Sequence, residues 1–285
     1  MKRLWICFCA CALLLSLVGC TRAMPVIKTV EGESCAVPIL MYHSVLKDPA
    51  RTCKFIVTPD RLRQDIAYLL DNGYETVVMQ DLTDYVEGIG TLPDKPVVLT
   101  FDDGYLNNLT YVLPILEEYD CRAVLSVVGA YTQRFSETPD PNPSYAHVTW
   151  LDIRALMLNE RFEIQNHSWD MHGQKGRMGS ARKKGESDAE YTKVFTADVQ
   201  RLQTELTNRC GITPKFFTYP FGIIDRLSRS LLKEMGFVGT LTCYESISCV
   251  KVGDFASLWG LGRFNRPGDL STEAFMKKVF GSSDS

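Results

Sequence analysis

Two adjacent carboxylates, Asp102 and Asp103, follow directly after the apolar run 96–101, "PVVLTF". Neighbouring carboxylates repel each other, and this repulsion raises the pKa of one of them unless a positive charge lies close by. A divalent cation would supply that charge, with one carboxylate as its ligand and the other free to act as a base. Asp-Asp-Gly is also a common turn composition, so the pair alone does not separate a site from a turn.

Three of the four His residues stand at or just after the ends of segments that we predict to be strands. His43 ends "PILMYH", and His167 and His172 follow "FEIQN", whereas His147 lies in a Pro-rich loop. Two neutral imidazoles and one carboxylate form a divalent-metal site with positions left for water. Taken alone, the His pair could be two surface residues of a loop. Beside an Asp pair at another strand end, a metal site is favoured.

Apolar strand patterns alternate with helical patterns along the whole chain. Strands are predicted at 37–45, 75–79, 96–101, 122–128, 162–167, 215–220, 237–243 and 258–264, and helices include 58–73, 80–88, 149–157, 188–209, 225–236 and 271–280. This alternation predicts parallel strands that are buried on both faces. Seven or eight such units indicate an α/β fold, a distorted (β/α)7–8 barrel. Active sites of such barrels lie where the strands end and the loops begin.

The composition is that of one large globular domain. The chain has 285 residues, of which 45% are hydrophobic and 23% charged, and its formal net charge is −3. Such a balanced charge gives no indication of nucleic-acid binding.

The first 19 residues have the pattern of a secretory signal peptide, with Lys2 and Arg3 before a long apolar run. The sequence "LVGC", which ends at Cys20, resembles the bacterial lipobox. That resemblance implies cleavage before Cys20 and attachment of a lipid to its thiol; the alternative is a plain signal peptide with an incidental Cys. We therefore expect a protein anchored to the outer face of the cell membrane, with a tether at 20–36 and a folded domain at 37–285.

Ten Cys residues suggest disulfides at first, but four of them lie within residues 1–20. No remaining pair has C-x-x-C spacing, so a thiolate zinc site is not indicated. Export permits disulfides, and Cys243 with Cys249 is the favoured local pair. Buried free thiols are the alternative.

The sequences "TFDDGY", "NHSWDMH" and "TYPFG" together resemble the motifs of the polysaccharide deacetylases, the NodB-homology or carbohydrate esterase family 4 fold. "PILMYHSV" resembles the circularly permuted branch that includes poly-N-acetylglucosamine deacetylases. The resemblance covers most of 37–265 and implies a NodB-type barrel. It also implies a hydrolase that removes acetyl groups from N-acetylated or O-acetylated sugars with a divalent metal. Zinc is the expected ion, with cobalt, nickel and iron as alternatives.

The resemblance also implies roles for individual residues. Asp102 would be the general base, and His43 the general acid for the departing amine. The backbone N–H of Phe221 would help to hold the oxyanion. The metal ligands would be Asp103, His167 and His172.

Two departures from the family pattern concern the catalytic residues. The gap between the two motif His residues is four residues, where many members have three; the poly-N-acetylglucosamine branch shows the longer gap. Many members also have an Arg that supports the base where this chain has Thr218. Arg263, at the end of "LWGLGR", is a candidate replacement, and an ordinary surface Arg is the alternative.

The surroundings of the site are less well defined by the sequence. We predict that Tyr105, Trp169 and Tyr219 contact the substrate; for Tyr105 and Trp169, packing in the core or in a lid is the alternative. The polar, basic segment 172–191 is expected to be a mobile flap over the cleft, or else a solvated loop.

The expected activity is removal of acetyl groups from an N-acetylated polysaccharide of the cell envelope, of peptidoglycan or poly-N-acetylglucosamine type, with release of acetate by a monomeric enzyme. Three alternatives stay open. One is a non-catalytic, glycan-binding surface lipoprotein, and another is an O-acetyl xylan esterase. The third is an iron oxygenase with the same ligand types, which the wide separation of Asp103 from His167 disfavours.

Overall fold

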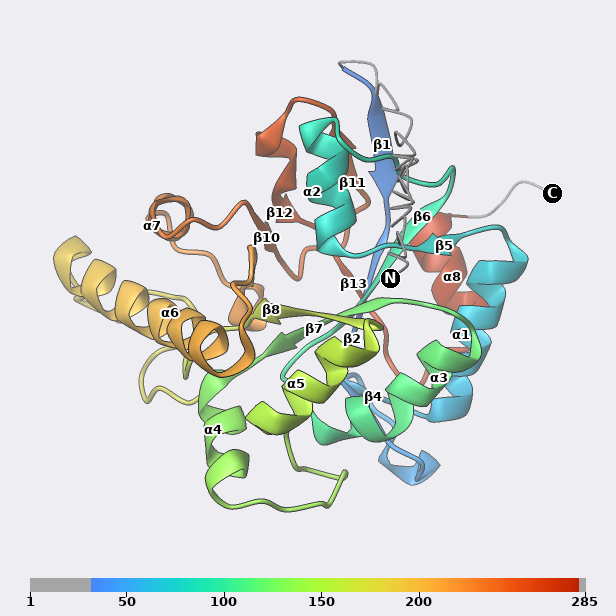
Figure 1. Cartoon of the computed structure of the whole chain (residues 1–285), viewed down its shortest axis with the longest axis horizontal. Coiled ribbons are helices and arrows are strands. Elements are labelled where there is room, and N and C mark those ends of the chain that lie inside the picture. Colours follow the sequence, from blue (N-terminus) through green and yellow to red (C-terminus); the bar gives the residue numbers. More distant parts are fainter. Residues whose placement is uncertain (1–31, 282–285) are drawn as a thin grey trace, which may run out of the picture.

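A curled sheet of parallel strands forms the centre of the fold (Figure 1). The computed structural model describes residues 32–281. Neighbouring strands follow the order β12-β10-β9-β8-β7-β6-β2-β13, and β5 pairs with β6. The strands are β2 (Ile39–Tyr42), β5 (Glu75–Thr76), β6 (Pro96–Phe101), β7 (Ala123–Val127), β8 (Phe162–Asn166), β9 (Phe216–Thr218), β10 (Gly239–Leu241), β12 (Trp259–Leu261) and β13 (Phe264–Asn265).

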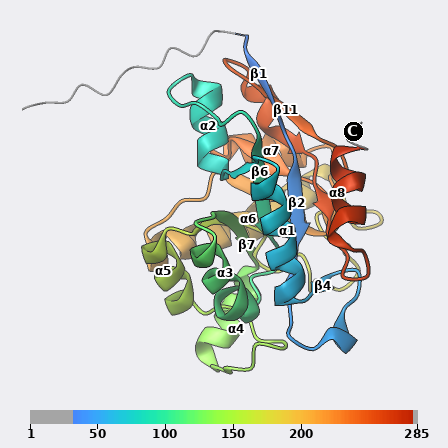
Figure 2. The same ribbon diagram turned by 90° about the vertical axis from the view of Figure 1, so that its right-hand side faces the viewer.

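Helices cover this sheet, and α1, α3 and α8 lie along one side of it (Figure 2). The α-helices are α1 (Pro59–Asp71), α2 (Met79–Glu87), α3 (Leu113–Glu118), α4 (Gly129–Glu137), α5 (Trp150–Asn159), α6 (Asp188–Cys210), α7 (Ser228–Glu234) and α8 (Thr272–Phe280). The short turns are η1 (Pro49–Arg51), η2 (Asn108–Val112), η3 (Pro220–Gly222) and η4 (Phe255–Leu258).

The helices begin where the sequence supplies capping groups. Thr58 accepts a hydrogen bond from the backbone N–H of Arg61 at the start of α1, and Pro59 occupies the first helical position. Reciprocal capping boxes start α5 and α6. Every residue of β6 and β7 is buried, as expected for parallel strands covered on both faces.

The prediction of a distorted α/β barrel is confirmed. Within the described residues, the end strands β12 and β13 do not pair with each other, so the barrel is open. No helix among those residues is long and apolar enough to cross a membrane. The predicted signal peptide 1–19 and the lipidation site Cys20 lie outside the described part of the chain.

Several segment boundaries differ from the prediction, and the strand expected at 258–264 is divided into β12 and β13, which lie at opposite ends of the sheet order. The strand expected at 75–79 stops after Thr76, because the carboxylate of Asp81 accepts the N–H of Val78 at 2.7 Å and starts α2 there. The strand expected at 37–45 is divided at His43 into β2 and β3 (Ser44–Val45), and β3 pairs with β4 (Ile56–Val57). The tether assigned to 20–36 is shorter, since β1 (Ser34–Val37) pairs antiparallel with β11 (Ser248–Lys251).

No disulfide joins the candidate pair Cys243 and Cys249, and all six Cys residues among the described positions are free thiols, the alternative that the sequence left open. Cys243 Sγ lies 3.8 Å from Met41 Sδ and 3.9 Å from a guanidinium nitrogen of Arg263, whereas Cys249 is exposed on β11. The two thiols therefore occupy different environments.

Candidate active site

The carboxylates of Asp102 and Asp103 stand at the carboxyl end of β6, where the chain turns sharply. Asp103 has φ of 71° and Gly104 has φ of 69°, so two successive residues adopt the left-handed conformation. That conformation is uncommon for residues other than Gly, although Asp tolerates it better than most. The turn separates the two side chains and sends them to different partners, as the sequence analysis expected.

Asp103, His167 and His172 converge on one point. Asp103 Oδ1 lies 3.5 Å from Nε2 of each imidazole, and the two Nε2 atoms are 3.0 Å apart. One donor atom from each residue lies within 4.8 Å of the other two. Three such donors can share a single divalent ion and leave further coordination positions for water and substrate.

Hydrogen bonding orients His167 for a metal ion. His167 Nδ1 lies 2.7 Å from the carbonyl oxygen of Thr218, so Nδ1 carries a proton and Nε2 faces the centre. Burial alone would lower the pKa of His167, but the neighbouring carboxylates outweigh it and raise that pKa, so a metal ion competes with a proton for Nε2. Asp103 Oδ1 is buried and accepts no hydrogen bond from the described residues. Burial lowers the pKa of His172 to about 4, which keeps this imidazole neutral and able to ligate. Burial alone would raise the pKa of Asp103, but the neighbouring imidazoles outweigh it and hold that pKa low.

A carboxylate that the sequence analysis missed shapes the loop that carries both imidazoles. Asp198, on α6, accepts the backbone N–H groups of Trp169 at 2.7 Å and Asp170 at 3.1 Å, and the side-chain amide of Gln174 at 3.1 Å. Burial raises the pKa of Asp198 to about 6. An Asp in the middle of a long helix carries no sequence signal for this role, because its partners lie in a different segment.

Asp102 forms a buried, bidentate ion pair with Arg263. The two guanidinium nitrogens lie 2.8 Å from the two carboxylate oxygens, and the side chains are 0% and 2% exposed. Burial alone would raise the pKa of Asp102, but Arg263 outweighs it and holds that pKa below its usual value. Arg263 Nε also donates to the carbonyl of Thr242 at 2.8 Å, which fixes the guanidinium. This is the contact that the predicted supporting role of Arg263 requires.

Thr218 occupies the position where the family pattern has an Arg, and it contacts His167. Its hydroxyl lies 2.7 Å from the hydroxyl of Ser126, and its carbonyl orients His167. Its side chain is fully buried between neighbouring strands. A long cationic side chain would have no room there.

His43 and Phe221 complete the set of predicted catalytic residues. His43 follows β2, and burial lowers the pKa of its imidazole; its Nδ1 is buried and has no hydrogen-bond partner among the described residues. Phe221 adopts φ of 56°, a strained conformation for an aromatic residue, and its ring centre lies 4.6 Å from that of His172. The backbone at Phe221 is thereby held beside the metal ligands.

A cavity of about 460 Å³ connects these groups. That volume lies within the range of about 300–1,000 Å³ that is typical of small-molecule sites. The predicted residues that line it are His43, Asp102, Asp103, Tyr105, His167, His172 and Phe221.

Two of the three residues predicted to contact the substrate, Trp169 and Tyr219, do not line the cavity. Trp169 is only 7% exposed and packs under the guanidinium of Arg201, 3.8 Å from its ring centre. Tyr219 is 1% exposed, and its hydroxyl lies 2.9 Å from that of Ser228. Neither lines the cavity, because each side chain packs into the interior of the protein. Tyr105 does line it.

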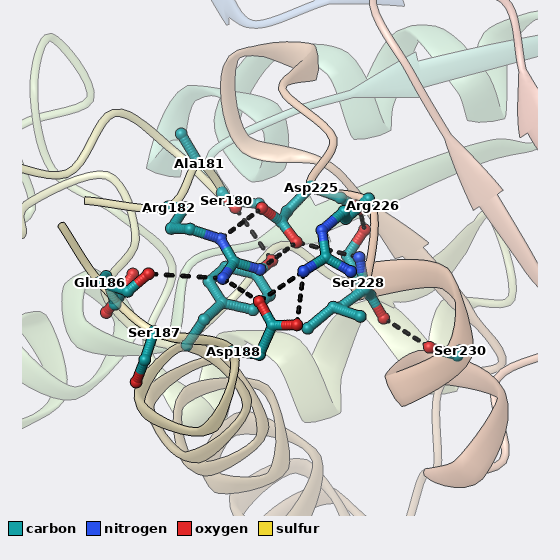
Figure 3. Close-up of polar contacts among 12 residues, drawn as sticks. Ser180, Ala181, Arg182, Glu186, Ser187, Asp188, Asp225, Arg226, Ser228 and Ser230 are labelled. Carbon is teal, nitrogen blue, oxygen red and sulfur yellow. Dashed lines mark hydrogen bonds and ion pairs between the residues drawn. The ribbon is translucent and has the colours of Figure 1, made fainter. Parts of the chain in front are cut away.

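The segment 172–191 is packed against the protein and does not form the expected flap (Figure 3). Arg182 makes a two-pronged contact with Asp225 at 3.2 Å and also reaches Asp188, which Arg226 contacts from the other side. A side chain at Gly179 would lie 2.3 Å from the carbonyl oxygen of Pro220, so the segment sits directly on the loop of Phe221. After His172, no residue of this segment lines the cavity.

Comparison with known proteins agrees with this site. The family model described as "Polysaccharide deacetylase" matches residues 89–239. The poly-beta-1,6-N-acetyl-D-glucosamine N-deacetylase of Escherichia coli (strain K12) is 28% identical over 220 residues, which are 70% of this chain and 32% of that protein. The chain therefore spans about a third of the length of this curated relative.

Solved structures show the same fold. A de-N-acetylase from Aggregatibacter actinomycetemcomitans has a TM-score of 0.74 at 24% identity, covering 86% of this chain and 100% of its own. IcaB from Ammonifex degensii has a TM-score of 0.68 at 20% identity, covering 88% and 97%. Membership of the circularly permuted branch stays a prediction. On the match of the family model, over more than half of its length, the chain belongs to the polysaccharide deacetylase family.

Proposed function

We propose that the chain is a metal-dependent hydrolase that removes acetyl groups from an N-acetylated polysaccharide and releases acetate. One observation carries this proposal: a three-residue metal-ligand set, a base paired with Arg263 and the imidazole of His43 meet in one cavity. Metal-assisted hydrolysis of an acetamide uses a Lewis acid, a base for the water and an acid for the amine, and these groups can supply all three.

Each residue has a task that its geometry permits. A divalent cation held by Asp103, His167 and His172 would polarise the acetyl carbonyl and acidify a bound water. Asp102, kept ionised by Arg263, accepts the proton of the attacking water. The backbone N–H of Phe221 donates to the oxyanion, and His43 gives a proton to the departing sugar nitrogen. Zinc is the proposed ion, because two imidazoles and a carboxylate are typical zinc ligands.

The proposed substrate is a glycan of the cell envelope. The named activity of the Escherichia coli relative supports a poly-N-acetylglucosamine type of polymer, and peptidoglycan is the second candidate. The lipobox-like sequence at Cys20 supports a lipid anchor on the outer face of the membrane, which would keep the site near such a polymer. Cells fed a labelled fatty acid should incorporate the label into the wild type and not into Cys20→Ala. Equal labelling of the two proteins, or no labelling of the wild type, would contradict the anchor.

Acetate release tests the activity directly. The purified chain is assayed on poly-N-acetylglucosamine, peptidoglycan and acetylated xylan, before and after removal of metal with a chelator and after addition of zinc. Asp102→Asn should abolish turnover and retain zinc, whereas His167→Ala should lose zinc. Full activity of the metal-free protein would refute the mechanism. Glycan binding without acetate release would favour a non-catalytic lipoprotein, and activity on xylan alone would favour an esterase.

A further inference from the structure

We propose that Lys54, Phe55 and Asn265 form the subsite that binds the sugar ring of the acetylated residue. This sugar wall would make the enzyme selective for glycans over small acetylated compounds. The inference rests on the proposed function and adds the determinants of substrate specificity to it. All three residues line the catalytic cavity, and none of them belongs to a motif that the sequence analysis identified.

The position of the sugar wall follows from the chemistry of the leaving group. His43 gives its proton to the sugar nitrogen, so the ring that carries this nitrogen must lie on the His43 side of the metal ligands. Phe55 occupies that side, since its ring centre lies 4.8 Å from that of His43. Phe55 is also 45% exposed, so part of its ring surface is available to the apolar face of a sugar.

Asn265 supplies an unused hydrogen-bond acceptor. Its Nδ2 donates to the backbone carbonyl of Lys54 at 2.9 Å, which fixes the orientation of the amide. Its Oδ1 is buried and has no partner among the described residues. Buried polar atoms normally have hydrogen-bond partners, so this oxygen at the cavity wall is suited to accept a donor from a ligand. A sugar hydroxyl is such a donor, whereas the acetyl group itself is not.

The sugar wall is built into a rigid loop. The carbonyl of Phe55 accepts the N–H of Ser44 at 3.1 Å, and the carbonyl of Cys53 accepts the N–H of Gly268 at 2.9 Å. A side chain at Gly268 would lie 2.2 Å from the carbonyl oxygen of Ile56, so the chain after β13 packs directly on this loop. A preformed wall binds its ligand without the entropy cost of ordering a mobile segment.

Lys54 extends the sugar wall with a cation that lines the cavity. Its Nζ lies 5.1 Å from the ring centre of Phe55, within the range of a cation–π contact. From there its ammonium group can donate to the hydroxyls of a bound sugar. The three residues thus offer an apolar face, an acceptor and a donor, the combination that a pyranose ring requires.

Two substrates separate sugar binding from catalysis. An N-acetylglucosamine oligomer carries the ring, and methyl acetate carries the acetyl group on a one-carbon leaving group that cannot reach a sugar subsite; the ester background is measured with Asp102→Asn. Phe55→Ala and Asn265→Ala should each lower kcat/KM for the oligomer about tenfold or more, and change that for the ester by less than about twofold.

Matched control variants lie elsewhere on the protein. Phe255 on η4 is 48% exposed and does not line the cavity. Asn159 at the end of α5 also donates its Nδ2, to Glu117 at 2.6 Å, and its buried Oδ1 has no partner within residues 32–281. Phe255→Ala and Asn159→Ala should leave the hydrolysis of both substrates unchanged. Equal losses on oligomer and ester, or equal losses in the controls, would overturn the sugar wall.

Binding measurements keep the sugar wall testable by itself. Calorimetric titration with the oligomer should show weaker binding to Phe55→Ala and Asn265→Ala than to the wild type. If the wild type hydrolyses neither substrate, the proposed function fails, and the titration still decides the assignment of the sugar wall. Equal oligomer affinity of the wild type and both variants would refute it.

Discussion

Replacement of Arg263 by Met tests whether the base depends on its buried partner. The variant removes the guanidinium that contacts both oxygens of Asp102 at 2.8 Å and leaves the carboxyl group in a site that is 2% exposed. Burial raises the pKa of Asp102, and Arg263 is the main group that lowers it. Without Arg263, the pKa of Asp102 should therefore rise above its usual value. The pKa of a buried carboxyl group without a partner rises by up to about 3–5 units. Each unit corresponds to about 1.4 kcal/mol of free energy between the charged and neutral forms.

Two measurable changes follow from this shift. The acidic limb of the kcat/KM profile should move upward by about 2 units or more, since Asp102 accepts a proton only when ionised. The free energy of unfolding at neutral pH should fall by about 3–5 kcal/mol, because an uncompensated charge stays buried. Arg263→Lys keeps the charge and loses the two-pronged geometry, so it should lie between the wild type and Arg263→Met.

The double variant Arg263→Met with Asp102→Asn is the decisive control. It removes both charges, so its loss of stability should be clearly smaller than the sum of the two single losses. Urea unfolding gives the stabilities, and acetate release across the acidic and neutral range gives the profiles. An unmoved acidic limb, together with additive losses of stability, would show that Arg263 does not hold Asp102 in its ionised state.

Two further predictions concern residues behind the cavity wall. His147 packs against Tyr105 and Tyr131 with both ring nitrogens buried and unpaired among the described residues, and burial lowers its pKa to about 4. The pKa of His147 is near 6.5 in the unfolded chain, so its contribution to stability is complete above about pH 6.5. This contribution is lost as the pH falls toward 4, because protonation of the imidazole then favours the unfolded chain. His147→Phe should melt at a higher temperature than the wild type at acidic pH, with little difference at neutral pH; parallel melting curves at both would contradict this. Asp198→Asn should weaken zinc binding by about 10–100-fold in a chelator competition, because the loop with His167 and His172 loses its anchor. An unchanged zinc affinity would assign Asp198 to stability alone.

The sequence predicted the fold and the centre of the site for the same physical reason. Parallel strands bring their carboxyl ends to one edge, so polar residues that follow buried runs must meet there. This rule placed Asp102 and Asp103 after β6, His167 and His172 after β8, and His43 after β2. None of these placements required knowledge of the loops.

Side-chain direction within the loops was not predictable in this way. Trp169 lies between two metal ligands in sequence, yet its ring turns into the core because Asp198 holds the backbone of the loop from α6. Local sequence contains no information on a contact between residues 29 positions apart. The flap predicted at 172–191 has the same explanation. The sequence of this basic segment does not show whether it is solvated or packed, because its acidic partners, such as Asp225, lie elsewhere in the chain.

The Arg263–Asp102 pair shows what a missing residue in a motif can reveal. A buried carboxylate that must stay ionised needs a cation beside it. This requirement determines where the positive charge must lie, but any segment that reaches that position can supply it. The expected Arg is replaced by Thr218, whose buried position between strands leaves no room for a guanidinium. Arg263 reaches the same carboxylate from 161 positions away, because β12 and β13 bring its backbone to the carboxyl-end edge of the sheet. The absence of one charge from its motif is therefore a reason to search every other strand end for its substitute.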